Sequence, residues 1–238
     1  MTNQFGNDIY CSPKTLSLLA MGFLGGVLLC NVLFVLLSIG LLTSDRKMSL
    51  VTGESVPLAF VLIGFVGVLH LLLFLASIVF FLIWEHRAFK NLSALRAQNV
   101  EFTPGWAVGW WFIPFANLLK PYQAISELWN ESDPDFDPEG GFLSSAVGSP
   151  PIVGWWWAFF IISNILLSLT NMMANGGRPS EIGAAFAVVF LTATLVRSVD
   201  DFLVIKIIRN ITARQELRFL NLGSLNNFGA PPPPPRFD

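Results

Sequence analysis

Four long apolar runs constrain this chain more than any other feature of its sequence. Three of them, residues 16–42, 57–83 and 152–172, contain no Asp, Glu, Lys or Arg. A fourth run, residues 182–208, carries charged side chains only in its second half. Crossing the hydrocarbon core of a bilayer takes about 20 helical residues, so each run is long enough to span it. With 53% hydrophobic and 13% charged residues, the sequence predicts an all-α integral membrane protein with four transmembrane helices.

These runs also predict how the chain is divided. A membrane domain, residues 16–208, lies between an N-terminal tail, residues 1–15, and a C-terminal tail, residues 209–238, which ends in a run of prolines. Within the membrane domain, residues 85–129 form a predicted interfacial segment. Its first part, residues 85–99, is expected to continue the second helix past Trp84 as a basic amphipathic extension. Residues 130–151 are acidic and rich in Pro and Gly, which is typical of a linker, here leading to the third helix.

The basic residues predict the orientation. Ten of the 14 Lys and Arg residues lie on or beside the face that holds both termini: Lys14, Arg87, Lys90, Arg96, Lys120, Lys206, Arg209, Arg214, Arg218 and Arg236. Only Arg46, Lys47 and Arg178 lie on the opposite face. Cytoplasmic loops carry the excess of Lys and Arg, so we predict a cell-membrane protein with both termini in the cytoplasm.

The tryptophans are concentrated on the same face. All eight tryptophans fall between Trp84 and Trp157, and indole rings prefer the boundary between lipid and water. The apolar stretch 105–119 is too short to span and contains Pro114, which favours an interfacial or re-entrant segment. Pro121 is placed to begin a short helix that ends near Trp129. The residues expected to contact lipid or a partner protein are Trp106, Trp110, Trp111, Phe112, Pro114, Asn117, Pro121 and Trp129.

Polar residues within the apolar runs form a second candidate site. At about 1.5 Å of rise per residue, one polar side chain on each helix lies about 18 to 23 Å from its inner end. These four residues are Asn31, His70, Asn164 and Thr194. Arg197, Asp200 and Asp201 share one side of the fourth helix because they are three and four residues apart. Either these groups only pack the helices through hydrogen bonds and an ion pair, or they bind a small molecule, ion or proton.

Several classes of function are not supported by the sequence. It has no GxSxG elbow, phosphate-binding loop, HExxH pair or CxxC motif. The two histidines, His70 and His86, are about 24 Å apart along one predicted helix, too far to hold a haem between them. A net charge of −2 argues against nucleic-acid binding. We expect no catalytic residue, no metal and no cofactor.

One stretch resembles a known family. The run GWWFIPFANLLKPYQAISELW, the aromatic triplet Trp155–Trp157 and the later run RNITARQ are similar to the bacterial membrane family called domain of unknown function 4328. The resemblance covers residues 102–215. It implies a multi-pass bacterial membrane protein with a Trp-rich inner loop, and it supplies no catalytic residue.

The features together favour a non-enzymatic membrane scaffold or interaction subunit that acts through its cytoplasmic aromatic face. Its expected partners are the lipid bilayer and a membrane or cytoplasmic protein. The main alternative is a transporter or ion-binding protein with a polar site around His70 and Arg197. A third hypothesis, an enzyme acting on lipid through Asp200 or His70, has weaker support.

Overall fold

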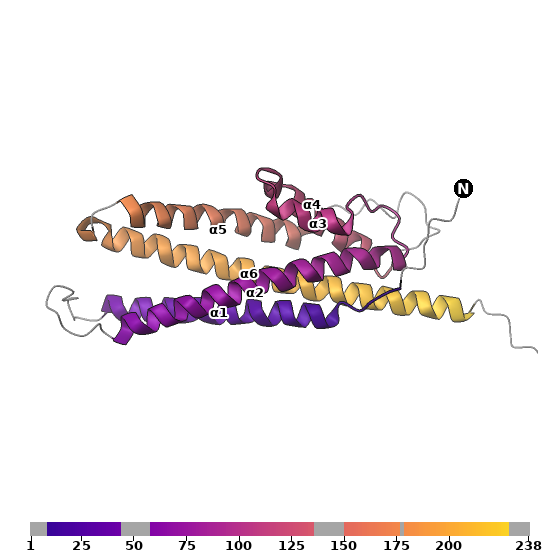
Figure 1. Cartoon of the computed structure of the whole chain (residues 1–238), viewed down its shortest axis with the longest axis horizontal. Helices are drawn as coiled ribbons and strands as arrows, with labels where there is room; N and C mark the ends of the chain where they lie inside the picture. The colour runs from indigo at the N-terminus through magenta and orange to yellow at the C-terminus, as the bar shows by residue number, and fades with distance from the viewer. Residues whose placement is uncertain (1–8, 44–57, 136–149, 177–178, 229–238) are drawn as a thin grey trace, which may run out of the picture. The chain divides into compact units, whose positions relative to one another are not determined.

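The computed structural model describes residues 9–43, 58–135, 150–176 and 179–228, and the predicted all-helical class is confirmed for them. The elements are α1 (Lys14–Thr43), α2 (Leu58–Ala94), α3 (Pro104–Gly109), the 3-10 helices η1 (Trp110–Phe112) and η2 (Ala116–Leu118), α4 (Lys120–Glu131), α5 (Pro151–Gly176) and α6 (Pro179–Phe228) (Figure 1). These residues contain no strand. The C-terminal prolines and most of the acidic linker lie outside the described residues.

Three stretches of helix are long and apolar enough to cross a membrane: Lys14–Leu37, Val61–Ala94 and Pro151–Asn175. By length and composition, the chain is therefore a multi-pass membrane protein. The fourth predicted crossing, residues 182–208 in α6, is not among these three, and it stays a prediction.

The chain divides into two compact units. The membrane unit consists of residues 15–84 and 151–208, and the flanking unit consists of residues 1–14, 85–150 and 209–238. Helices α2 and α6 each contribute one part to either unit.

In the membrane unit, α1 and α2 approach each other closely at Gly26. A Cβ atom added to this glycine would lie 3.0 Å from Cδ1 of Leu73, so a side chain here would force the leucine to move. Nearby, the rings of Phe23 and Phe80 stack with their centroids 5.1 Å apart. Gly26 thus allows close packing of two helices within the chain. Gly22, one turn earlier in α1, has no such role, because a Cβ added there would meet nothing within 4 Å among the described residues.

The flanking unit has its own apolar core. It is built from the end of α2, from α4 and from the end of α6, through the buried residues Ala88, Phe89, Leu92, Leu95, Ala124, Ile125, Leu128 and Ile211. In α2 and α4, the spacing of these residues by three and four puts them on one face of the helix. The predicted continuation of the second helix past Trp84 is confirmed, since α2 reaches Ala94.

Two helix ends differ from what the sequence suggests. Residues 209–228, assigned above to a tail, continue α6 as far as Phe228. The buried residues of this part of α6 include Ile211, Gln215 and Arg218, which are spaced as on one helix face. Because two of these three are polar, hydropathy gives little indication of a helix here. Helix α2 ends where Arg96 adopts a positive φ of 57°, and the amide of Ala97 donates to the carbonyl of Leu92 at 3.0 Å.

Candidate functional site

The first candidate site is the aromatic segment, residues 104–119, which is broken into α3, η1 and η2. Thr103 caps α3, because its side-chain oxygen accepts a hydrogen bond from the amide of Trp106 at 3.4 Å, and Pro104 occupies the first turn. Pro114 separates the two 3-10 helices. The segment therefore forms no helix of membrane-spanning length, as predicted for an interfacial or re-entrant stretch.

A strained turn sits at the centre of the aromatic segment. Phe115 has φ 66° and ψ −43°, and the amide of Ala116 donates to the carbonyl of Pro114 at 2.8 Å. This is the geometry of the rare γ-turn with positive φ, which is costly for a residue that carries a side chain. Phe115 is also 87% exposed, so no packing of its ring compensates for the strain.

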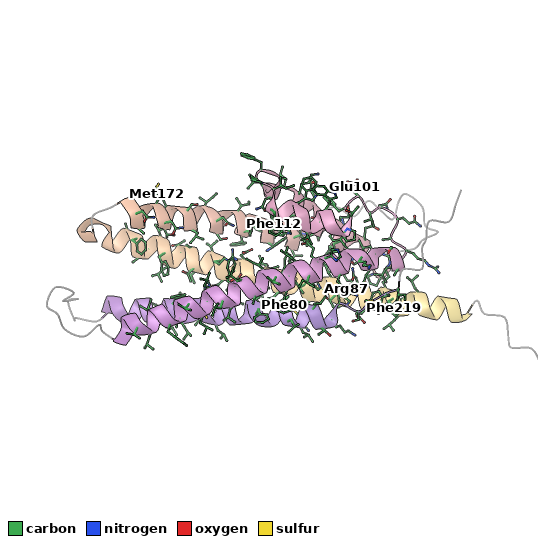
Figure 2. The ribbon with its side chains drawn as sticks, viewed as in Figure 1. Phe80, Arg87, Glu101, Phe112, Met172 and Phe219 are labelled. Atoms are coloured by element: carbon green, nitrogen blue, oxygen red, sulfur yellow. The ribbon has the colours of Figure 1, made fainter. Side chains whose placement is uncertain are left out.

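The turn presents a cluster of exposed apolar side chains, which we call the apolar tip. Its members are Trp106, Phe112, Ile113, Phe115, Leu118 and Leu119. Phe112, labelled in Figure 2, is 71% exposed and Leu119 is 63% exposed. Monomeric soluble proteins rarely expose a contiguous apolar cluster of this kind unless it binds something.

A buried carboxylate fixes the other side of the aromatic segment. The indole Nε1 of Trp111 donates to Oε2 of Glu85 at 2.9 Å. Glu85 is fully buried, and its Oε1 has no hydrogen-bond partner among the described residues. Because Glu85 directly follows Trp84 in α2, this bond attaches the segment at the residue where the apolar run ends.

Lys120, which directly follows the aromatic segment, contacts aromatic rings at the start and in the middle of this region. Its Nζ lies 5.5 Å from the ring centroid of Phe102 and 5.8 Å from that of Trp110, within the range of cation–π attraction. The rings of Trp106 and Trp110 are 5.0 Å apart.

The predicted surface residues are not equally accessible. Trp106, Phe112 and Pro114 are exposed, whereas Trp110, Trp111, Asn117 and Trp129 are half-buried. Pro121 is buried, and Trp129 faces the guanidinium of Arg214 at 5.3 Å. Sequence reasoning missed Ile113, Phe115, Leu118 and Leu119, although their apolar character on either side of Pro114 was available as a signal.

The second candidate site lies in the membrane unit, where the structure brings together Asn31, Arg197, Asp200 and Asp201. The guanidinium of Arg197 lies 3.5 Å from a carboxylate oxygen of each aspartate. Nδ2 of Asn31 donates to Oδ2 of Asp201 at 3.3 Å. Asn31 and both aspartates are buried, and Oδ1 of Asp200 has no hydrogen-bond partner among the described residues.

The remaining residues of that prediction are placed differently. His70 is near the cluster, because the Phe74 ring lies 6.3 Å from the His70 ring and 5.2 Å from the Arg197 guanidinium. Asn164 and Thr194 instead donate to carbonyls of their own helices, those of Phe160 and Phe190. Asn164 is exposed, so the structure does not bring it to the cluster.

These observations define an all-helical, multi-pass membrane protein with an aromatic segment between its second and third candidate spans. The chain belongs to the family described as Domain of unknown function (DUF4328), whose model matches residues 48–213. The family resemblance seen in the sequence is thereby confirmed. No curated protein and no solved structure matches the chain.

Proposed function

We propose that this protein is a non-enzymatic membrane scaffold with four crossings and both termini in the cytoplasm. In this proposal, the apolar tip rests in the cytoplasmic leaflet, at the boundary between lipid and water. The observation that carries it is the apolar tip itself, held outward by the strained turn at Phe115.

The energetics of the apolar tip favour lipid over water. Burying a large apolar side chain gains about 1.5 to 3 kcal/mol, so six exposed ones give a strong drive to leave water. Aromatic rings are also enriched at membrane interfaces. The hydrogen bond between Trp111 and Glu85 supports this placement at the lipid–water boundary, because Glu85 is the first residue after the apolar run of α2.

Basic residues near the segment support the proposed orientation. His86 and Lys90 are exposed on the continuation of α2, and Lys120 lies at the base of the segment. Basic side chains are attracted to the anionic headgroups of the cytoplasmic leaflet. The excess of Lys and Arg at this end of the chain agrees with that placement.

Photo-crosslinking tests which molecule covers the apolar tip. A benzophenone amino acid would replace Phe112 in one variant and Asp135, an exposed residue beyond α4, in a matched control. In native membranes, we expect Phe112 to yield lipid adducts and Asp135 to yield none. A protein adduct at Phe112 would show that the apolar tip binds a protein instead of lipid. Equal yields of lipid adducts at both positions would contradict the proposal.

A second candidate function, transport or ion binding, is favoured by the buried Oδ1 of Asp200, which has no hydrogen-bond partner among the described residues. It requires water to reach His70. A His70→Cys variant lacking the native cysteines should then react with a water-soluble thiol reagent, while a Val68→Cys control on the same helix should not. Absence of reaction at position 70 would count against this function.

A further inference from the structure

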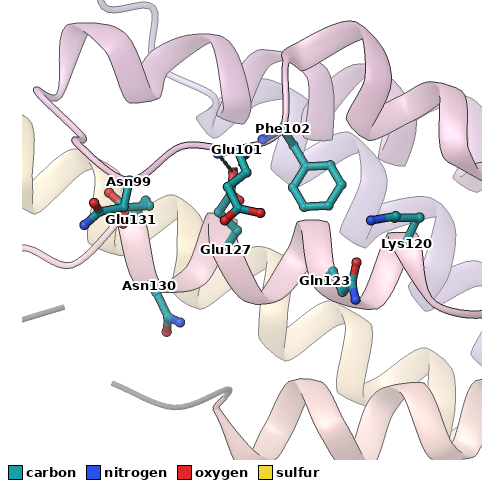
Figure 3. Close-up of a pocket in the computed structure, with 8 residues that line it drawn as sticks. All are labelled: Asn99, Glu101, Phe102, Lys120, Gln123, Glu127, Asn130 and Glu131. Carbon is teal, nitrogen blue, oxygen red and sulfur yellow. Dashed lines mark hydrogen bonds between the residues drawn. The ribbon is translucent and has the colours of Figure 1, made fainter. Parts of the chain in front are cut away.

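The flanking unit contains an open pocket that shares only Phe102 and Lys120 with the first candidate site. Its volume is about 590 Å³, within the range of small-molecule sites. The pocket lies between residues 99–102 and one side of α4 (Figure 3). Its lining residues are Asn99, Glu101, Phe102, Lys120, Gln123, Glu127, Asn130 and Glu131.

The pocket is held in shape by Glu127. Its Oε1 accepts hydrogen bonds from the main-chain amides of Glu101 and Phe102, both at 3.1 Å. This contact ties the loop before the aromatic segment to α4. It also brings the Glu101 side chain to the same pocket, as Figure 3 shows.

A second carboxylate of the pocket, that of Glu131, has one oxygen without a hydrogen bond in the described part of the chain, although the charge of Arg218 acts on the group. Glu131 is only 8% exposed, and its Oε2 makes no hydrogen bond among the described residues. A buried carboxylate oxygen without a donor is costly, and a cation or an N–H group entering the pocket would supply one.

The carboxylates also influence one another. Burial raises the pKa of Glu127, and the negative charges of Glu101 and Glu131 raise it further, against the effect of its two main-chain hydrogen bonds. A bound cation would relieve this repulsion.

The lining favours an organic cation over a metal ion. Three glutamates and one lysine leave a net charge of −2 on the lining. Among the residues that the structure describes, no three His, Cys, Asp or Glu side chains converge closely enough to hold a metal ion. The ammonium group of Lys120 lies over the Phe102 ring, which shows that this ring can accept an organic cation. Asn99 and Gln123 add amide oxygens that can accept from N–H donors.

We propose that this pocket binds a linear aliphatic diamine, with one ammonium group at Glu131 and the other near Glu101 and Glu127. Two separated positive charges match carboxylates that do not converge on one point. The pocket is open on one side and its lining is mainly polar, so the ligand would enter from the aqueous phase.

Titration of the full-length protein in uncharged lipid nanodiscs tests the site, with 1,4-diaminobutane as the probe. Glu127→Gln keeps the oxygen that accepts both main-chain hydrogen bonds while removing the charge. Glu131→Gln removes the negative charge of the carboxylate whose Oε2 has no hydrogen-bond donor among the described residues. Asp135→Asn removes an exposed charge outside the lining and serves as the control.

We expect saturable diamine binding that weakens about tenfold in each glutamate variant, as for a partly screened ion pair, and is unchanged in the control. Binding of 1-aminobutane should be weaker than that of the diamine. Any of three results would overturn the proposal: no saturable binding of the diamine, an equal loss in Asp135→Asn, or equally tight binding of Mg²⁺. Thermal unfolding of each variant separates loss of the site from loss of the fold.

Discussion

At the residue scale, Phe115 has a backbone conformation that destabilises its turn and a ring that is exposed. A positive φ costs a residue with a side chain about 1 to 3 kcal/mol, whereas glycine adopts it freely. The chain nevertheless has a large aromatic residue there, with its ring directed away from the protein. Strain of this kind is a feature of functional positions, and it fits a ring that is used outside the chain.

Replacing Phe115 with glycine should therefore stabilise the turn by about 1 kcal/mol while removing an aromatic contact. Hydrogen exchange of the amides of Ala116, Leu118 and Leu119 measures the effect, because each donates within the turn. We expect slower exchange in Phe115→Gly. The exposed Phe112, which has no such strain, should give faster exchange when changed to glycine. Faster exchange in both variants would contradict the assigned strain.

Also at the residue scale, Glu216 fastens the N-terminal tail to α6. Its carboxylate accepts hydrogen bonds from the hydroxyls of Tyr10 (3.1 Å) and Ser12, and it pairs with Nζ of Lys14 at 3.0 Å. Burial acts to raise the pKa of Glu216, but these hydrogen bonds and the charge of Lys14 outweigh it and lower the pKa below the usual 4.5. The charged form thus favours the attached tail.

Acid should release the tail. Because the pKa of Glu216 is lowered by attachment, the stabilisation is complete above pH 4.5 and is lost as pH falls through the lowered value. Cys11 is exposed and Cys30 is buried, so a spin label can be attached at Cys11 alone. Its spectrum should be more mobile well below pH 4.5 than at pH 7, with some restriction left by the two hydrogen bonds between Cys11 and Asn91. In Glu216→Gln the spectrum at pH 7 should already be the more mobile one. A spectrum that changes neither with acid nor with the substitution would exclude this role.

At the element scale, three parts of the flanking unit are joined by polar side chains of α6. Arg218 is buried and donates to the main-chain carbonyls of Leu95, Glu131 and Asp133. Gln215 donates to the carbonyl of Ala88 and to the hydroxyl of Ser132. The ends of α2 and α4 are thus held by hydrogen bonds to α6 as well as by apolar packing.

Arg218→Met should destabilise the flanking unit by about 3 kcal/mol, because it leaves buried carbonyls without a donor. Arg218→Lys should recover part of this loss, since lysine keeps the charge but not the fork of donors. Arg209→Met, at an exposed position of the same helix, should have little effect. Thermal unfolding in detergent compares the three variants, and equal losses for positions 209 and 218 would show that this network contributes nothing specific.

The same helices show what sequence patterns can and cannot predict. The apolar run of α2 is recognised by its length, and the basic amphipathic continuation by its helical periodicity, and both occur as predicted. The continuation of α6 does not, because its inward face relies on Gln215 and Arg218, whose burial depends on carbonyls elsewhere in the chain. Helix α4 was predicted from Pro121 to Trp129 and extends from Lys120 to Glu131.

At the scale of the whole molecule, composition and hydropathy are enough to indicate a multi-pass helical membrane protein, and three candidate spans agree. Helical spacing alone predicts the pairing of Arg197 with Asp200 and Asp201, which the structure contains. The glutamate-lined pocket could not be predicted in this way. It depends on a loop returning to α4 through the bond between Glu127 and two main-chain amides.

The depth of residue 115 in a bilayer tests the central claim most directly. An environment-sensitive fluorophore would be attached to Phe115→Cys in a variant without Cys11 and Cys30, with Asp135→Cys as the control position. In vesicles, the account predicts that quenchers attached near the lipid headgroups reduce emission at position 115, whereas a water-soluble quencher acts only at position 135. If the water-soluble quencher reached both positions equally, the aromatic segment would lie in water and the proposed docking on the membrane would be wrong.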